Sequence, residues 1–220
     1  MTKVLVIGGS GGVGLACVRE ALARGHEVRM FARSASETGL RDERLEKVDG
    51  DARVAGDVAR ALEGTTAVLQ TLGVPLGLKL VTGPITLFSK STEVLLPAMR
   101  SAGVGRLVAL TGFGAGDSRA AVSALQRPAF DLVFGKAYAD KGEQERMIEA
   151  SGLDWTLVRP GVLRDGPKSG EYRVLVDPER WRNGLIRRAD VADFMVSAID
   201  SREHVGKAPV LISRPLLPFG

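Results

Sequence analysis

A glycine-rich turn directly after a short apolar run constrains this chain more than any other feature. Residues 4–7 are all apolar, and the next seven are Gly8-Gly9-Ser10-Gly11-Gly12-Val13-Gly14. Gly8 permits a tight turn, Gly11 lets backbone amides approach a ligand, and Gly14 lets the following helix pack closely on the strand. The order strand, glycine turn and helix therefore predicts a helix N terminus that binds the pyrophosphate of a dinucleotide.

The second expected strand, 27–31, is followed by Ala32-Arg33-Ser34. An NAD-specific protein usually places an acid there for the ribose 2′-hydroxyl, whereas the Arg33 guanidinium can pair with a 2′-phosphate and stack on adenine. We therefore expect NADP(H), with Ser34 beside it, although an ordinary surface arginine is the alternative for Arg33. A P-loop is excluded because no Gly-Lys-Ser/Thr follows the glycines.

Short apolar runs alternate with helical patterns along the whole chain, which is typical of a parallel sheet covered on both faces. The expected strands are 4–7, 27–31, 45–48, 67–71, 106–110, 155–158 and 209–212. The expected helices are 13–24, 54–62, 84–102, 139–150 and 189–200, several of them ending at Gly25, Gly64, Gly103 or Gly152. Pro97 inside the third helix predicts a kink or a local break.

The fold class is thus α/β: a Rossmann-type doubly wound parallel sheet with helices on both faces and a small substrate-side region. Residues 1–220 are expected to form one NAD(P)-binding domain. Two segments, at about 112–138 and 162–188, depart from the alternation and follow strands at their carboxyl ends. That edge holds the ligand crevice in an open parallel sheet, so both segments are expected to wall the substrate side.

Composition is typical of a globular protein, and the charge is compatible with an anionic ligand at least as well as with nucleic acid. The net charge of +4 comes from basic residues interleaved with acids over all 220 residues, so nucleic acid is not an expected direct partner. The single Cys17 excludes an intramolecular disulfide, and His26 and His204 have no companions that would make a metal site. Without an evident leader or membrane segment, we expect a cytoplasmic monomer or homodimer that binds a small-molecule substrate.

The spacing Gly8-x-x-Gly11-x-x-Gly14 resembles the atypical and extended short-chain dehydrogenase/reductase superfamily. Within it, residues 3–212 are similar to the NmrA-like NAD(P)-binding proteins, which include the biliverdin-IXβ/flavin reductases. The resemblance rests on the glycine turn and on motifs at 48–51 (Val-Asp-Gly-Asp), 70–73 (Gln-Thr-Leu-Gly), 107–112, 141–145 (Lys-x-x-x-Glu), 151–161 and 188–192.

The resemblance implies which residues hold the cofactor. The glycine turn contributes Gly8, Ser10, Gly11, Gly12 and Val13. Asp51 would contact adenine, although a helix cap or a turn is an equal alternative for it. Leu72 and Gly73 would pass beside the adenosine ribose and pyrophosphate. On the nicotinamide side the resemblance implies Thr111 at a strand end, Lys141 on the nicotinamide ribose, and Pro160, Gly161 and Val162 beside the amide. Asp190 would be a helix cap.

The catalytic pattern departs from most short-chain dehydrogenases, which place a tyrosine four residues before the lysine. Position 137 is Ala, and Tyr138 lies three residues before Lys141, rotated by about 100 degrees on a regular helix. Tyr138 stays a candidate acid if the helix begins irregularly, together with Lys141 and Thr111 as the other candidate catalytic residues. Acceptors that delocalise charge and take a proton from water are easier to reconcile with this departure.

We therefore expect an NADPH-dependent oxidoreductase that transfers hydride to a small, planar acceptor such as a flavin, a quinone or a conjugated tetrapyrrole. The aromatic residues of the two irregular segments would form either an apolar shelf for such a ring or a core under the loops; they are Phe113, Phe130, Phe134 and Trp181. A non-catalytic NADP(H)-binding redox sensor is the alternative. A sugar-nucleotide-type epimerase is a weaker one, because the chain is short for a substrate domain.

Overall fold

The computed structural model describes residues 2–74, 85–125 and 127–215. An eight-stranded sheet with the order β3-β2-β1-β4-β5-β6-β10-β8 forms its centre. Its strands are β1 (Lys3–Ile7), β2 (Glu27–Ala32), β3 (Leu45–Asp49), β4 (Ala67–Gln70), β5 (Arg106–Leu110), β6 (Asp154–Pro160), β8 (Arg173–Leu175) and β10 (Val210–Ile212). All neighbours are parallel except β10 and β8. This order confirms the predicted doubly wound fold.

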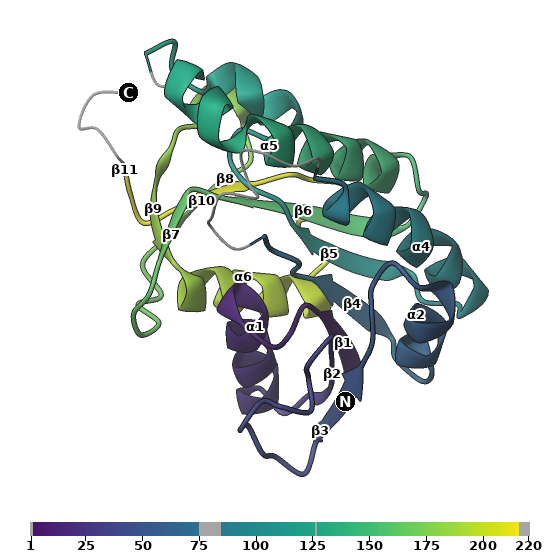
Figure 1. Ribbon diagram of the computed structural model, residues 1–220. Coiled ribbons are helices and arrows are strands. Elements are labelled where there is room, and N and C mark those ends of the chain that lie inside the picture. Colours follow the sequence, from purple (N-terminus) through teal and green to yellow (C-terminus); the bar gives the residue numbers. More distant parts are fainter. Residues whose placement is uncertain (1, 75–84, 126, 216–220) are drawn as a thin grey trace.

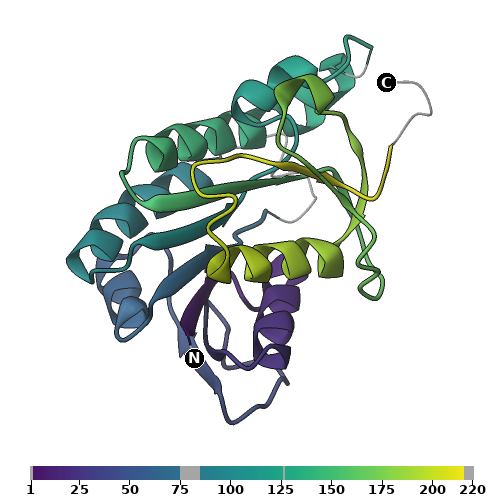
Figure 2. The same ribbon diagram turned by 180° about the vertical axis from the view of Figure 1, so that it is seen from behind.

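Helices cover both faces of this sheet, as Figures 1 and 2 show. On one face lie α1 (Gly12–Ala23) and α6 (Arg188–Asp200), and on the other α2 (Ala55–Leu62), α4 (Leu87–Ser101) and α5 (Arg127–Glu149). Residues 4–7 of β1 are all apolar because the strand faces a core on each side of the sheet. Val4 and Val6 belong to the core on the α1 side, and Leu5 belongs to the core on the α2 side.

A second, three-stranded sheet lies at the carboxyl end of β6, at the left of Figure 1. It consists of β7 (Val162–Arg164), β9 (Gly184–Arg187) and β11 (Arg214–Pro215). Strand β7 is parallel to β9, and β11 is antiparallel to it. Two short 3-10 helices, η1 (Gly116–Ala121) and η2 (Pro178–Arg180), complete the elements of the described residues.

The predicted elements agree with the observed ones within a few residues, with one large exception. Helix α5 begins at Arg127, twelve residues before the predicted start at 139, so the segment 112–138 is largely helical rather than irregular. Pro128 is compatible with the first turn of a helix, and Phe130, Phe134 and Tyr138, spaced four residues apart, contact one another along it.

Helix α4 continues through Pro97 without a break. Its predicted first residue, Pro84, lies outside the described residues. The four glycines expected to end helices, at 25, 64, 103 and 152, all have positive φ angles.

Candidate functional site: a dinucleotide cradle

The glycine turn joins β1 to α1 at the point where the sheet order reverses direction, between β1 and β4. Gly14 packs so closely that a Cβ atom there would lie 2.1 Å from the carbonyl oxygen of Gly8, which confirms the close packing expected at this position. At Gly11 and Gly12, by contrast, an added Cβ would meet no atom of the described residues within 4 Å. One side of the turn is therefore locked against the sheet, and the other side is open.

The N terminus of α1 faces this open side without a protein partner of its own. Gly11 is the N-cap, no side chain caps the helix among the described residues, and its first turn carries no acidic residue. Ser10 is half-buried and Val13 is buried at the start of the helix. Unpaired N–H groups and the positive end of the helix dipole make such a terminus a binding site for an anion, and the open glycines leave room for one. The residues present therefore fit the pyrophosphate of a dinucleotide.

Arg33 follows β2 directly and is exposed, with Ser34 half-buried after it. Within the described part of the chain, Arg33 forms no ion pair. The neighbouring carboxylate of Asp51 is engaged elsewhere: it accepts hydrogen bonds from the backbone N–H of Arg53 at 2.9 Å and from its guanidinium at 2.6 Å. The hydrogen bond from the Arg53 side chain holds the pKa of Asp51 at about 2. These bonds agree with the alternative in which Asp51 is a turn residue. Its contact with adenine stays a prediction.

The end of β4 lies beside the glycine turn. The hydroxyl of Thr71 donates to the Ile7 carbonyl at 2.7 Å, which ties the two strand ends together. Leu72 is half-buried against the core, and Gly73 is exposed, with open space where a Cβ would be. Leu72 and Gly73 are therefore placed at the edge where the resemblance puts the adenosine ribose.

Thr111, at the end of β5, is buried within a charged network. Its hydroxyl donates to Glu145 Oε1 at 2.6 Å, and Glu145 also accepts two hydrogen bonds from Arg159, at 2.8 and 3.0 Å. Arg159 Nη1 forms an ion pair with the Asp117 carboxylate at 2.6 Å. Burial alone would lower the pKa of Arg159, but its hydrogen bonds with Glu145 and the charges of Glu145 and Asp117 raise it. The Thr111 hydroxyl is therefore engaged in holding the interior.

Lys141 is buried below the same strand end. Its ammonium donates to the carbonyl oxygen of Thr111 at 3.0 Å and lies 4.0 Å from the centre of the Phe88 ring. Burial lowers the pKa of Lys141 to about 8, against the opposing pull of the Glu145 and Asp140 charges. The side chain thus points at the β5 backbone, and its expected bond to a nicotinamide ribose stays a prediction.

Tyr138 lies inside the regular part of α5, so the irregular helix start that would have reoriented it does not occur. Its hydroxyl packs on Gly112, where an added Cβ would lie 2.7 Å away, and Phe130 contacts its ring edge-on at 4.7 Å between centroids. Burial raises the pKa of Tyr138 to about 12. Ala137 is buried where the short-chain dehydrogenase tyrosine would be. The phenol is therefore a weak acid in a packed position.

The four predicted shelf aromatics do not form one surface. Phe113 is buried in a core cluster against which Trp181 packs, as in the alternative interpretation. Phe130 and Phe134 instead join Tyr138 in a partly buried row along α5, which we call the α5 aromatic row. Phe134 and Tyr138 also pack beside Leu72, at the carboxyl end of β4. The prediction of a single shelf is wrong, because two of its four residues form a row along α5 and the other two pack in a separate core cluster.

The segment after β6 crosses the small sheet. Gly161 packs on β9 so tightly that a Cβ would lie 2.2 Å from the Gly184 carbonyl oxygen. Pro160 is buried, and Val162 is 47% exposed, so of these three only Val162 presents a side chain to the outside. Their placement beside a nicotinamide amide is not tested by this geometry.

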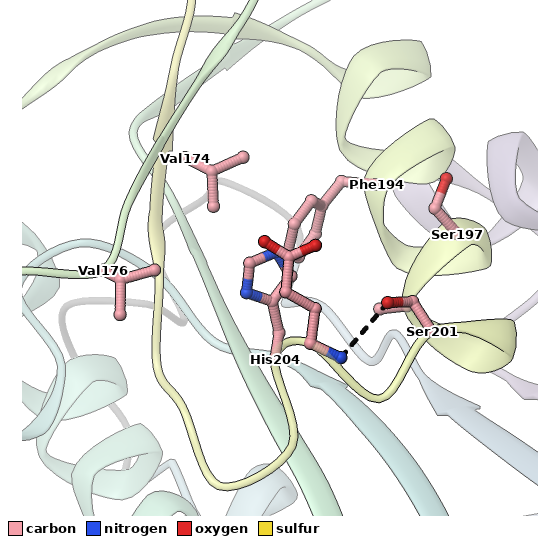
Figure 3. A pocket seen from close by; sticks show the side chains of 8 residues that line it. Val174, Val176, Phe194, Ser197, Ser201 and His204 are labelled. Carbon is pink, nitrogen blue, oxygen red and sulfur yellow. Dashed lines mark hydrogen bonds and ion pairs between the residues drawn. The ribbon is translucent and has the colours of Figure 1, made fainter.

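A pocket of about 360 Å³ lies elsewhere, between α6, β8 and the segment after α6. Figure 3 shows the His204 ring between Phe194 and the side chains of Val174 and Val176. The carbonyl of His204 accepts from Thr156 at 2.8 Å, at the amino-terminal end of β6. This pocket is therefore at the opposite edge of the sheet from the glycine turn and is not the dinucleotide cradle.

Several site residues escaped the sequence reasoning. Asp140 accepts from the Phe88 backbone N–H at 2.8 Å and so caps α4 from a different helix. Gln144 donates to Gln70 at 2.9 Å in the interior. The motif Lys141-x-x-x-Glu145 hinted that Glu145 lies on the Lys141 face of the helix, but its partner Arg159 is fourteen residues away and only the fold brings them together.

Residues 8–202 match the sequence profile of the NAD(P)H-binding family. The chain belongs to this family. Its cofactor is therefore a nicotinamide dinucleotide, as predicted. The predicted Rossmann-type fold and the oxidoreductase class also agree with this family.

Known proteins resemble nearly the whole chain. An uncharacterized chloroplastic protein of Arabidopsis thaliana is 29% identical over 98% of this chain and 78% of its own. A protein of Bacillus subtilis strain 168 named as an uncharacterized sugar epimerase is 27% identical over 94% and 92%. The structure of ChuY from Escherichia coli O157:H7, described as an anaerobillin reductase, is 26% identical, with a TM-score of 0.79 over 99% of this chain and all of that one.

Among the described residues, no helix combines the length and the apolar character needed to cross a bilayer. The family makes a small molecule the expected substrate. The cytoplasmic location and the monomeric or dimeric state stay predictions, since one of the relatives is chloroplastic.

Proposed function

We propose that the protein is an NADPH-dependent reductase that transfers hydride to a small planar acceptor such as a flavin, a quinone or a conjugated tetrapyrrole. The observation that carries this proposal is the uncapped N terminus of α1 beneath the open glycines Gly11 and Gly12, at the switch point of the sheet. When bound there, NADPH supplies the hydride. The backbone N–H groups of Gly11, Gly12 and Val13 hold the pyrophosphate, with Gly8 and Ser10 shaping the turn.

Arg33 selects NADPH over NADH in this proposal. Its side chain is exposed at the end of β2 and has no ion pair within the described segments, while Arg53 occupies the carboxylate of nearby Asp51. A 2′-phosphate placed there meets an exposed guanidinium, with which it can form a charge-assisted pair. Ser34 adds a hydroxyl beside it.

Two features support an acceptor that takes its proton from water. The phenol of Tyr138 packs on Gly112 with its pKa raised to about 12 by burial, and the Lys141 ammonium is directed at the Thr111 carbonyl. A carbonyl substrate needs a positioned acid as hydride arrives, whereas a conjugated acceptor spreads the charge over its rings. The α5 aromatic row gives such rings a surface to contact. The description of ChuY as an anaerobillin reductase supports the assignment to a reductase.

The first test of the proposal is turnover. Purified protein is mixed with NADPH and one of FMN, riboflavin, a benzoquinone, biliverdin or a simple ketone, and NADPH oxidation is followed at 340 nm against a protein-free control. We expect oxidation with at least one conjugated acceptor and none with the ketone. Tyr138→Phe should retain that rate within about threefold, since the phenol is not the proton donor. A hundredfold loss of the rate of NADPH oxidation would show instead that the Tyr138 phenol donates the proton.

The second test is cofactor choice. Arg33→Ala should weaken NADPH binding by about 1.5–3 kcal/mol, the size of a lost charge-assisted contact, and NADH binding far less. Arg19→Ala, which removes another exposed arginine further along α1, is the matched control and should change neither. Equal weakening of both cofactors by Arg33→Ala contradicts the assignment. Tight NADPH binding without oxidation by any acceptor would favour the redox-sensor alternative.

A further inference from the structure

Three arginines from three different strands share one face of the small sheet. The register pairs Arg164 with Arg187 and Arg214 with Leu185. Because side chains alternate along a strand, Arg187 and Leu185 lie on the same face, opposite the fully buried Ile186. All three guanidinium groups therefore start from the outer face of the sheet. We call Arg164, Arg187 and Arg214 the arginine face.

These guanidinium groups have few partners among the residues that the structure describes. Arg187 donates to the carbonyl oxygen of Pro167 at 3.0 Å, and Arg164 and Arg214 form no ion pair with any residue that the structure describes. The neighbouring Asp165 is paired with Arg188, at 2.8 Å. Like charges held together on one face repel each other, so an arrangement of this kind is favourable when an anion binds between them.

A pocket of about 120 Å³ opens on this face, and it contains a second sign of a missing partner. All three arginines line it, together with Leu185, Ser169, Glu171 and Ser213. The hydroxyl oxygen of Ser213 is buried and has no hydrogen-bond partner among the described residues. A buried hydroxyl normally finds a partner, and Ser213 belongs to the same pocket lining as the three arginines. Among the described residues of the lining, Glu171 is the only acid.

The position of the pocket connects it with the proposed reaction. Strand β7 follows the carboxyl end of β6 after a single residue, Gly161, and β11 follows β10 after Ser213 alone. Val162, which we place beside the nicotinamide, shares its face with Arg164, about 7 Å further along the strand. An acceptor ring over the nicotinamide could therefore extend a substituent towards the arginine face.

We propose that the arginine face and the Ser213 hydroxyl bind an anionic group of the hydride acceptor, either a carboxylate or a phosphate, and thereby select anionic over neutral planar acceptors. This proposal rests on the function proposed above. It deepens that function by naming the charge of the substrate and the residues that recognise it.

The test measures equilibrium binding to the protein saturated with NADP⁺, so that it does not depend on turnover. Matched pairs isolate the charge: FMN against riboflavin for phosphate, and biliverdin against its dimethyl ester for carboxylate. The variants are the double substitution Arg164→Gln/Arg214→Gln, which removes the two arginines without internal partners, the single substitution Ser213→Ala, and Arg19→Gln as a control from another surface.

We expect the wild type and Arg19→Gln to bind the anionic member of at least one pair tenfold or more tightly than the neutral member. The double variant should lose this preference while its affinity for the neutral member and for NADPH stays within twofold, and Ser213→Ala should lose part of it. The pair that shows the effect identifies phosphate or carboxylate as the source. The proposal is overturned by a wild-type preference below twofold, by an unchanged preference in the double variant, or by a loss of NADPH affinity instead.

Turnover of the same four compounds separates this proposal from the proposed function. Oxidation of NADPH by neutral and anionic acceptors alike, equal in wild type and double variant, keeps the reductase and removes the anion site. Arginine-dependent binding of the anionic compounds without any oxidation of NADPH keeps the anion site and removes the reductase.

Discussion

The buried pair of Glu145 and Arg159 makes the sharpest prediction about stability. Both side chains are at most 2% exposed, and the carboxylate accepts two hydrogen bonds from Arg159 and one from Thr111. Glu145→Met removes all three and leaves a buried guanidinium whose remaining partner, Asp117, has a side chain that is 70% exposed and well screened. Breaking such a pair from one side costs about 3–5 kcal/mol. In a chain of this length that corresponds to a fall in Tm of about 6–20 °C.

The assay is urea unfolding followed by circular dichroism. It compares the free energies of unfolding of the wild type, of Glu145→Met and of the double variant Glu145→Met/Arg159→Met, provided that their m-values are equal. The double variant removes both charges together, so it should be more stable than Glu145→Met although it carries one more substitution. A loss below about 1 kcal/mol in Glu145→Met, or a double variant as unstable as the single one, would refute the reasoning that the uncompensated charge dominates.

Three further predictions follow from close packing, titration and loop attachment. Gly14→Ala drives a Cβ into the Gly8 carbonyl and should lower both the Tm and the affinity for NADPH. Gly11→Ala places its Cβ in space free of described atoms and should lower only the affinity for NADPH. Thermal melting and cofactor titration of both variants check this difference. Lys141 is more easily protonated in the unfolded chain than in the folded protein, because its pKa falls to about 8 on folding. The free energy of unfolding of the wild type should therefore rise relative to that of Lys141→Met by about 2 kcal/mol between pH 7 and pH 9.5, as measured by urea unfolding. An unchanged difference between the two proteins would contradict the lowered pKa. The Asp190 carboxylate accepts hydrogen bonds from Ser169 at 2.7 and 2.8 Å and from the backbone N–H of Gly170, and so holds the loop that contains Lys168. Asp190→Ala should therefore make tryptic cleavage after Lys168 at least tenfold faster. Unchanged cleavage would show that other contacts hold this loop.

Local patterns were sufficient where an element depends mainly on its own residues. The glycine turn, the strands around it and the glycines that end helices follow from short-range chemistry, because a positive φ angle or a close backbone approach demands glycine whatever the rest of the chain does. The doubly wound order then follows from the alternation of such elements and the handedness of their connections. The cradle at the N terminus of α1 was therefore visible in the sequence.

The rest of the site depends on contacts across the fold. Strands β7, β9 and β11 have two to four residues each, too few to show a period, and only their pairing assembles the arginine face. Gly114, Gly116 and Pro128 are typical of loops and hid the early start of α5. Asp190 was expected to cap its own helix, but its carboxylate accepts from Ser169 and Gly170 and so holds the preceding loop.

The register of α5 links the fold to the proposed chemistry. Relative to most short-chain dehydrogenases, the tyrosine is moved by one residue along the helix, which rotates it by about 100 degrees. At the vacated position Ala137 is buried, and the displaced ring of Tyr138 packs between Gly112 and Phe130. One step along the helix thus converts a candidate acid into a member of an aromatic row. Under the proposed function, a site altered in this way disfavours carbonyls, which need a proton as the hydride arrives, and favours conjugated rings that can take the proton from water.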